Sequence, residues 1–150
     1  MMPRSLLLLA SGKVLNNMAD KVINYFYGLG RRKSATARVR VITGKGDITI
    51  NGKPAVEYLA DSNMLLRELQ RPFEVIESTK YDVSALVSGG GHSGQVDAIR
   101  LGIAKAFVAM NEDLKSTLKR ADLLGRDPRE KERKKFGLKG ARKQRQFTKR

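Results

Sequence analysis

Hydrophobic and polar residues alternate over several short stretches of the chain, and this period of two predicts β-strands. The alternation is weak from Tyr25 onward and becomes clear at Val39 and Val41, which face the opposite side of the strand from the neighbouring arginines. Another alternating stretch runs over residues 81–87 and stops at a triple glycine that cannot sustain a strand. We therefore expect half-buried strands in both places, the first with a cationic outer face.

Two shorter strands are also predicted. Residues 47–50 alternate directly after a Gly44-Lys45-Gly46 turn and stop at Asn51-Gly52, a pair that tolerates the positive φ angles of a tight reversal. We expect this strand to form a hairpin with the strand that contains Val41. A further short strand is predicted for Phe73–Ile76.

Apolar residues recur at helical spacing elsewhere in the chain. The predicted helices cover residues 56–59, 62–70, 93–110 and 112–120. Ser62 suits the N-cap of the second helix, and Pro72 is expected to end it. The third helix carries small residues such as Ala98 and Gly102, which would let it lie close against a sheet.

Composition narrows the possible functions. The chain of 150 residues has no Cys and one His, which excludes disulfides, zinc fingers and thiol nucleophiles and leaves little acid–base chemistry. No apolar run approaches the roughly 18 residues of a membrane span. The formal net charge is +15, so we expect a soluble intracellular protein with a polyanionic partner and no small-molecule substrate, cofactor, metal or membrane.

The positive charge is concentrated in two blocks. Residues 31–45 hold six cations and no acid, residues 46–119 hold eight cations and ten acids, and residues 120–150 hold thirteen cations and four acids. A near-neutral middle between basic blocks is typical of a packed domain with nucleic-acid-binding arms. We expect an N-terminal extension over 1–24, a globular domain over 25–125 and an extended basic tail over 126–150, which lacks an apolar period and would order on binding.

Two segments leave alternatives open. Residues 1–17 are expected to be poorly ordered, either as an upstream extension before a true start at Met18 or as a weak organelle-targeting peptide. The loop that contains Gly89, Gly90, Gly91 and Gly94 lies between a strand and a helix, where glycine backbones can bind phosphate. A tight turn is the favoured interpretation of this loop, because no Lys-Ser or Lys-Thr pair follows it. His92 is expected to cap or support the loop.

Several motifs in a fixed order carry a family resemblance. They are GLGRRKSATARVR from Gly28, ING at Ile50–Gly52, GGGHSGQ from Gly89, AIR at Ala98–Arg100, RDPRE and KERKK within Arg126–Lys135, and the terminal FTKR. In these motifs, and over about residues 25–150, the chain resembles the small-subunit ribosomal protein S-nine family of bacterial or organellar type. The resemblance implies an α+β fold, in which a mixed sheet packs against helices as in the second domain of ribosomal protein S-five.

The resemblance also implies partners and sites. The partners would be small-subunit rRNA in the head of the subunit, neighbouring head proteins and the peptidyl-site tRNA, on a cytoplasmic or organellar ribosome. Lys149 and Arg150 would approach the anticodon stem-loop of that tRNA. The basic blocks supply the expected rRNA contacts, which are Arg31, Arg32, Lys33, Arg38, Arg40, Arg126, Arg129, Arg133, Lys134, Lys135, Lys139, Arg142, Lys143 and Arg145.

Two other classes compete with this interpretation. A DNA-binding architectural protein would use similar basic arms, and a preference for duplex DNA over folded rRNA would favour it. An RNA-processing enzyme of the same fold would need a base, a metal cluster or a nucleotide loop, which one His and no Cys do not readily provide. We therefore expect a binding protein and not an enzyme.

Overall fold

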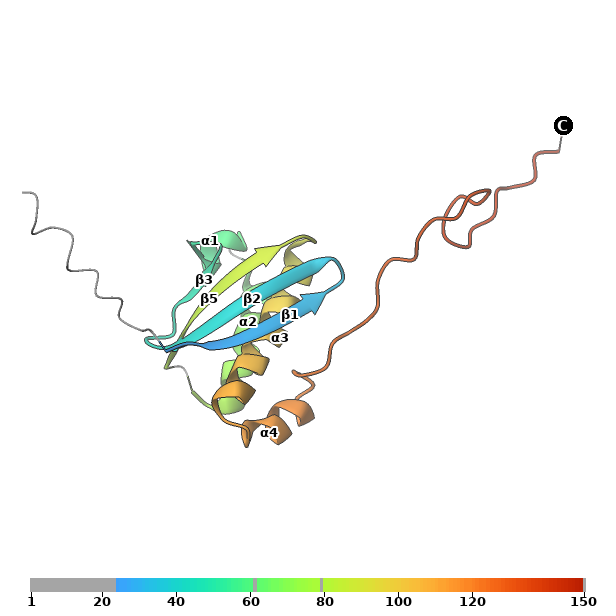
Figure 1. Ribbon diagram of the computed structural model, residues 1–150. Helices are drawn as coiled ribbons and strands as arrows, with labels where there is room; N and C mark the ends of the chain where they lie inside the picture. Colours follow the sequence, from blue (N-terminus) through green and yellow to red (C-terminus); the bar gives the residue numbers. More distant parts are fainter. Residues whose placement is uncertain (1–23, 61, 79, 150) are drawn as a thin grey trace, which may run out of the picture.

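The computed structural model describes residues 24–60, 62–78 and 80–149. Five strands form one mixed sheet in the order β1-β2-β5-β3-β4, antiparallel except for the parallel pair of β3 and β5 (Figure 1). The strands are β1 (Phe26–Arg32), β2 (Ala35–Thr43), β3 (Ile48–Ile50), β4 (Lys53–Pro54) and β5 (Tyr81–Ser88). The helices are α1 (Ala55–Tyr58), α2 (Asn63–Ile76), α3 (His92–Met110) and α4 (Leu114–Arg120). The fold is α+β, as expected. The segment 1–17, the start at Met18 and Arg150 lie outside the described residues.

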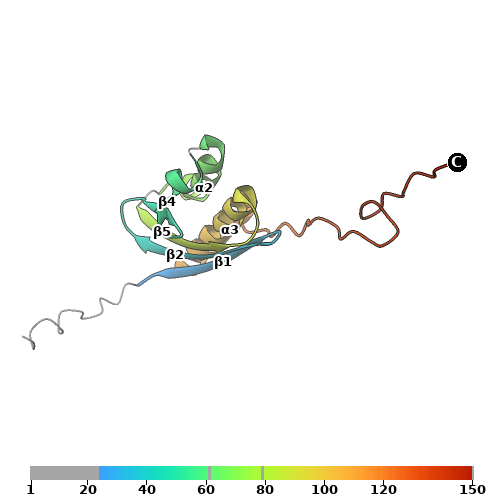
Figure 2. The same ribbon diagram turned by 90° about the horizontal axis from the view of Figure 1, so that it is seen from above.

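The helices lie on one side of the sheet and leave the other side open (Figure 2). The central strands alternate accordingly, because Val39 and Val41 of β2 are buried under the helices while Arg38 and Arg40 are exposed on the open face. In the core, the ring of Phe107 in α3 makes edge-to-face contacts with Phe73 and Tyr81.

Helix α3 packs unusually close to β1 because glycines face each other there. A Cβ atom built on Gly30 would lie 1.7 Å from the carbonyl oxygen of Ala98, and one built on Gly28 would lie 1.9 Å from the carbonyl oxygen of Gly102. Both values are far below any real contact, so only glycine fits in these two positions of β1. The first glycines of the GLGRRK motif therefore serve helix–sheet packing.

The expected hairpin between the strands at Val41 and at residues 47–50 is wrong. Strand β2 pairs with β1 and β5, and β3 instead pairs in parallel with the other edge of β5. Asp82 of β5 holds the connecting loop across the end of the sheet, since its carboxylate accepts hydrogen bonds from the backbone N–H groups of Lys45, Gly46 and Asp47 at 2.7–3.0 Å. Val83, Ala85 and Val87 of β5 pack in the core, and this strand takes the central place between β2 and β3.

The expected helix end at Pro72 and the expected strand at Phe73–Ile76 are also wrong. Pro72 lies inside α2, which continues to Ile76 and ends at Glu77 in the left-handed conformation. Pro72 and Phe73 are both buried, and this packing compensates for the backbone hydrogen bond that proline cannot donate. Ser62 does occupy the N-cap position, although its side chain makes no capping hydrogen bond.

After α4 the chain leaves the domain. Leu118 and Leu123 are buried and hold this end against the core. From residue 124 to 149 the described chain forms neither helix nor strand, and it runs away from the sheet (Figures 1 and 2). The long connection contains a local turn, in which the backbone N–H of Lys139 donates to the carbonyl of Lys143 at 2.8 Å.

Candidate nucleic-acid interface

The first basic block forms a two-stranded hairpin. Strands β1 and β2 are joined by the two residues Lys33 and Ser34, and Lys33 adopts the left-handed conformation with φ of 51°. Arg31 and Lys33 are exposed near the tip, and Arg38 and Arg40 are exposed along β2. The sequence-predicted cations of this block are therefore brought together on one hairpin, with one exception.

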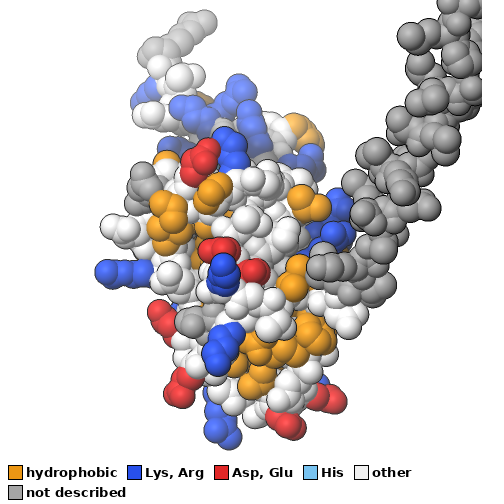
Figure 3. All heavy atoms as spheres, turned by 90° about the vertical axis from the view of Figure 1, so that its left-hand side faces the viewer, with side chains coloured by type: hydrophobic (Ala, Val, Ile, Leu, Met, Phe, Trp, Pro, Cys, Tyr) orange, Lys and Arg blue, Asp and Glu red, His pale blue; other side chains and the backbone are white. Residues whose placement is uncertain are grey.

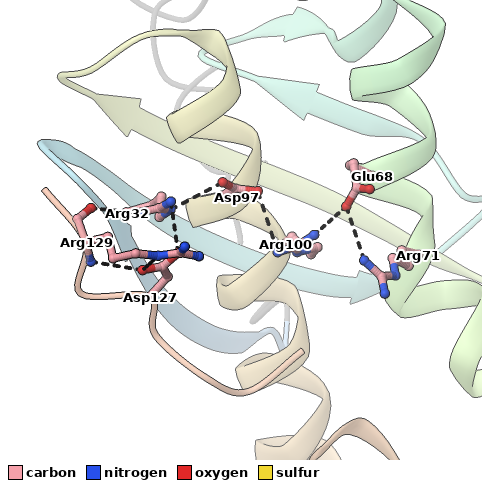
Figure 4. A network of polar contacts seen from close by, with 7 residues as sticks. All are labelled: Arg32, Glu68, Arg71, Asp97, Arg100, Asp127 and Arg129. Atoms are coloured by element: carbon pink, nitrogen blue, oxygen red, sulfur yellow. Dashed lines mark hydrogen bonds and ion pairs between the residues drawn. The ribbon is translucent and has the colours of Figure 1, made fainter. Parts of the chain in front are cut away.

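Arg32 is the exception, because it is paired within the protein. Its guanidinium lies 3.0 Å from the carboxylate of Asp127, 3.5 Å from that of Asp97, and donates to the backbone carbonyl of Arg129 at 2.8 Å (Figure 4). The side chain is 16% exposed. Arg32 thus joins β1, α3 and the first residues of the tail, and we call these contacts of Arg32, Asp97, Asp127 and Arg129 the tail clasp.

Asp127 is the carboxylate at the centre of the tail clasp. It accepts hydrogen bonds from the backbone N–H of Arg129 at 2.9 Å and from the guanidinium of Arg129 at 2.9–3.1 Å. These hydrogen bonds, with the positive charges of Arg129 and Arg32, lower the pKa of Asp127 to about 2. The same pairing raises the pKa of Arg129. Asp127 therefore stays ionised at any physiological pH.

The ion pairs continue from the tail clasp across the helical layer. Asp97 lies 3.6 Å from Arg100 of α3, Arg100 pairs with Glu68 of α2, and Glu68 lies 3.6 Å from Arg71 (Figure 4). Charges of alternating sign thus link the root of the tail to α3 and α2. The sequence did not predict Glu68, Asp97 and Asp127 as ion-pair partners of these arginines. The only signal for such pairs was that acidic residues lie close to Arg100 and Arg126 in the sequence motifs.

The tail presents its cations to solvent. Arg133, Lys134, Lys139, Lys143 and Arg145 are exposed and make no ion pair with another described residue. Lys135 and Arg142 both pair with Glu132, at 2.9 and 3.0 Å, and Arg126 lies 3.7 Å from Glu130. Exposed pairs of this kind contribute little, so phosphate can replace the acids.

The tail also exposes two aromatic side chains, and the charges on the domain surface are unevenly distributed. Phe136 and Phe147 are 100% and 87% exposed, and Lys149 is exposed at the end of the described chain. On the side of the molecule shown in Figure 3, Lys and Arg side chains are densest at the upper end, while the middle and lower parts carry both basic and acidic side chains. The positive charge is therefore uneven in space as well as along the sequence.

The glycine loop at Gly89–Gly91 packs against the hairpin. Gly89 and Gly90 have positive φ angles of 75° and 66°, and a Cβ on Gly89 would lie 2.5 Å from the carbonyl oxygen of Ser34. Gln95 also fixes the loop, because its side-chain amide donates to the carbonyl of Gly89 at 3.0 Å. Close backbone approach explains Gly89 and Gly90, in line with the favoured turn. Gly91 is the N-cap of α3, and Gly94 lies in the first turn of that helix.

The remaining candidate chemistry is sparse in the described part of the chain. His92 begins α3 and stacks on the ring of Tyr58, with 5.6 Å between the ring centroids. Among the described residues, no three His, Cys, Asp or Glu side chains are grouped so that they could hold a metal ion. None of the helices described is both long and apolar enough to cross a membrane.

A small α+β domain with a cationic hairpin and an exposed basic arm defines a protein of the nucleic-acid-binding class. The family described as Ribosomal protein S9/S16 matches residues 30–150, and the chain belongs to this family of ribosomal proteins, which is not a family of enzymes. One relative is the small ribosomal subunit protein uS9 of Mycoplasmoides gallisepticum (strain R(low / passage 15 / clone 2)). It is 50% identical over 126 residues, which cover 83% of this chain and 96% of the relative.

Proposed function

We propose that this protein binds small-subunit rRNA in the head of the ribosomal subunit and extends its tail to the peptidyl-site tRNA. Membership of the family makes it a ribosomal protein, a structural constituent of the small subunit that serves translation. The finer proposal rests on one observation above all. The stretch Arg133–Arg150 contains nine cations and no acid, and its described part projects from the domain with its Lys and Arg side chains exposed.

The exposed cations are assigned to rRNA phosphates. On the hairpin these are Arg31, Lys33, Arg38 and Arg40, and in the tail they are Arg126, Arg133, Lys134, Lys135, Lys139, Arg142, Lys143 and Arg145. Arg32 and Arg129 are assigned to the tail clasp, because both already bind Asp127. A guanidinium can contact two phosphate oxygens at once, which suits the arginines in this set.

The geometry of the tail fits a path between RNA helices. From Asp127 to Lys149 an extended chain reaches at most about 75 Å. Without a buried apolar face, such a segment gains order only when phosphates surround it. Neighbouring proteins of the subunit head would contact the globular domain. The proposed location of the protein is the ribosome, either cytoplasmic or organellar.

Salt dependence tests the rRNA part of the proposal. With roughly 6 to 10 phosphate contacts, affinity for small-subunit rRNA should fall by about 10³- to 10⁵-fold between 50 and 200 mM salt. Filter binding or fluorescence anisotropy with the full chain measures this slope. An affinity that hardly changes with salt would contradict binding through the cationic tail, and tighter binding to duplex DNA would favour an architectural DNA-binding protein.

The tRNA part is tested at the last two residues, Lys149 and Arg150. Their deletion should leave thermal unfolding and incorporation into the small subunit unchanged but should increase tRNA dissociation from the peptidyl site. The matched control removes two charges earlier in the tail, by Lys134→Ala with Lys139→Ala, and should weaken rRNA binding instead. Equal tRNA dissociation in both variants would show that the terminal residues have no special role.

A further inference from the structure

The open face of the sheet combines aromatic, aliphatic and cationic side chains in adjacent rows. In the register of β1 and β2, Tyr27 is directly opposite Arg40 and Leu29 is opposite Arg38, and Leu86 of β5 is on the other side of Arg38. Directly paired residues point to the same face of a sheet, so these five side chains share one surface. We call this set the sheet platform.

The sheet platform is accessible. Tyr27 and Leu86 are 48% and 51% exposed, and α2 and α3 lie on the opposite side of the sheet (Figure 2). Neighbouring apolar side chains that stay exposed on a monomer mark a surface that binds something. The set spans three strands, with the apolar side chains on β1 and β5 and the two arginines of β2 between them, so it is a continuous surface and not a set of isolated residues.

Charge selects the kind of partner. Among the described strand residues on this face, the only acid is Asp82, and its carboxylate already accepts three backbone hydrogen bonds from the loop at 45–47. Those hydrogen bonds lower the pKa of Asp82. Arg38 and Arg40 therefore dominate the potential of the face, which favours a polyanion that also has an apolar surface.

An unpaired RNA nucleotide has both properties. A sheet cannot enter the deep, narrow groove of an A-form helix, whereas bases in single-stranded loops can stack on exposed aromatic rings. The ring of Tyr25, which lies 5.0 Å from the guanidinium of Arg40, holds that cation beside Tyr27. A base over Tyr27 would thus have its phosphate next to Arg40.

We propose that the sheet platform binds an unpaired RNA base, which stacks on the ring of Tyr27 while Arg40 and Arg38 contact the flanking phosphates. This inference rests on the proposed function, because small-subunit rRNA supplies the nucleotide. The inference adds a second kind of RNA contact to the phosphate contacts proposed above. This contact is the stacking of a base on Tyr27, which is not one of the phosphate-binding cations.

A single introduced fluorophore tests the stacking. The chain contains no Trp, so Tyr27→Trp provides the only indole of the full-length protein. Oligoadenylate of ten nucleotides should quench its fluorescence to saturation, and a blunt RNA duplex of equal charge should not. The matched control is Met64→Trp, which places an indole on α2 at a residue that is 77% exposed and away from the sheet platform. It should show no quenching with either RNA.

Affinity measurements separate stacking from charge. Tyr27→Ala should weaken oligoadenylate binding by roughly 5- to 150-fold without changing the salt slope, and Tyr27→Phe should retain the wild-type affinity. Arg40→Ala should instead reduce the salt slope by about 1. Folding of each variant is checked by thermal unfolding.

The outcomes distinguish the two proposals. If the wild-type protein binds neither oligoadenylate nor rRNA, the proposed function itself fails. If the wild type binds RNA but Tyr27→Ala binds equally well and the introduced indole is not quenched, only the sheet platform is refuted. A crosslink from position 27 to a neighbouring ribosomal protein in the assembled subunit, with unchanged RNA affinity, would assign this face to a protein partner and overturn the inference.

Discussion

The substitution Gly30→Ala should destabilise the domain severely, although it adds a single methyl group. The new Cβ would lie 1.7 Å from the carbonyl oxygen and 2.8 Å from the carbonyl carbon of Ala98, and 2.9 Å from the backbone nitrogen of Gly102. These are backbone atoms of α3, which cannot rotate away as a flexible side chain could. An ordinary contact starts near 3.4 Å, so α3 must move away from β1 by more than about 1 Å, or β1 must leave the sheet.

The expected loss of stability follows from this geometry. Overpacked cores lose typically about 1–3 kcal/mol, and displacement of a whole helix places Gly30→Ala at or above the upper end, at about 3 kcal/mol or more. For a domain of this size, this corresponds to a fall in Tm of roughly 10–20 °C. Circular dichroism during thermal and urea unfolding of the full chain measures both quantities.

The control is Gly94→Ala, in the first turn of α3, the helix against which Gly30 packs. A Cβ there would meet only ordinary contacts, at 3.7 Å from the carbonyl oxygen of Arg32 and 3.8 Å from Ala35. Because alanine is the better helix former, this variant should be neutral or more stable by up to about 1 kcal/mol. A Gly30→Ala variant that unfolds within about 1 kcal/mol of the wild type would refute the close packing of α3 on β1.

Two further predictions concern the carboxylates. Arg32→Glu or Asp127→Arg alone should increase amide hydrogen exchange over residues 126–130, because like charges then face each other in the tail clasp. The double variant should restore protection only in part, because the new carboxylate would still face Asp97 and the new guanidinium would still face Arg129. Exchange that is unchanged in both single variants would contradict a role for this pair. The folded-state pKa of Asp127 is about 2, and that of Asp82 is also lowered from the ordinary value of 3.8. Both carboxylates therefore stabilise the folded state above about pH 4. This stabilisation is lost as the pH falls toward 2 and the carboxylates are protonated. Unfolding measured from pH 5 to pH 2 should show a smaller decline in Asp82→Asn and Asp127→Asn than in the wild type, and identical pH profiles would be evidence against these hydrogen bonds.

Local patterns in the sequence were sufficient for most of the elements. Alternation at Val39 and Val41 placed β2 and its cationic face, and helical spacing placed α3, because both patterns record which side of an element is buried. The exposed cations of the tail were also predictable, since a segment without an apolar face cannot be buried. The order of the strands was not predictable in this way, because alternation does not specify which strand lies beside which.

Tertiary contacts decided the rest. Pro72 reads locally as a helix end, yet the helix continues because Pro72 and Phe73 are buried. Arg32 cannot be distinguished from Arg31 by sequence, but the positions of Asp97 and Asp127 in space convert it from a free cation into part of the tail clasp. Composition by itself thus indicated a nucleic-acid-binding chain, and the motifs indicated the ribosomal family to which the chain belongs. Only the folded structure decided which of the described cations are paired within the protein, because ion pairing depends on residues that are distant in the sequence and adjacent in space.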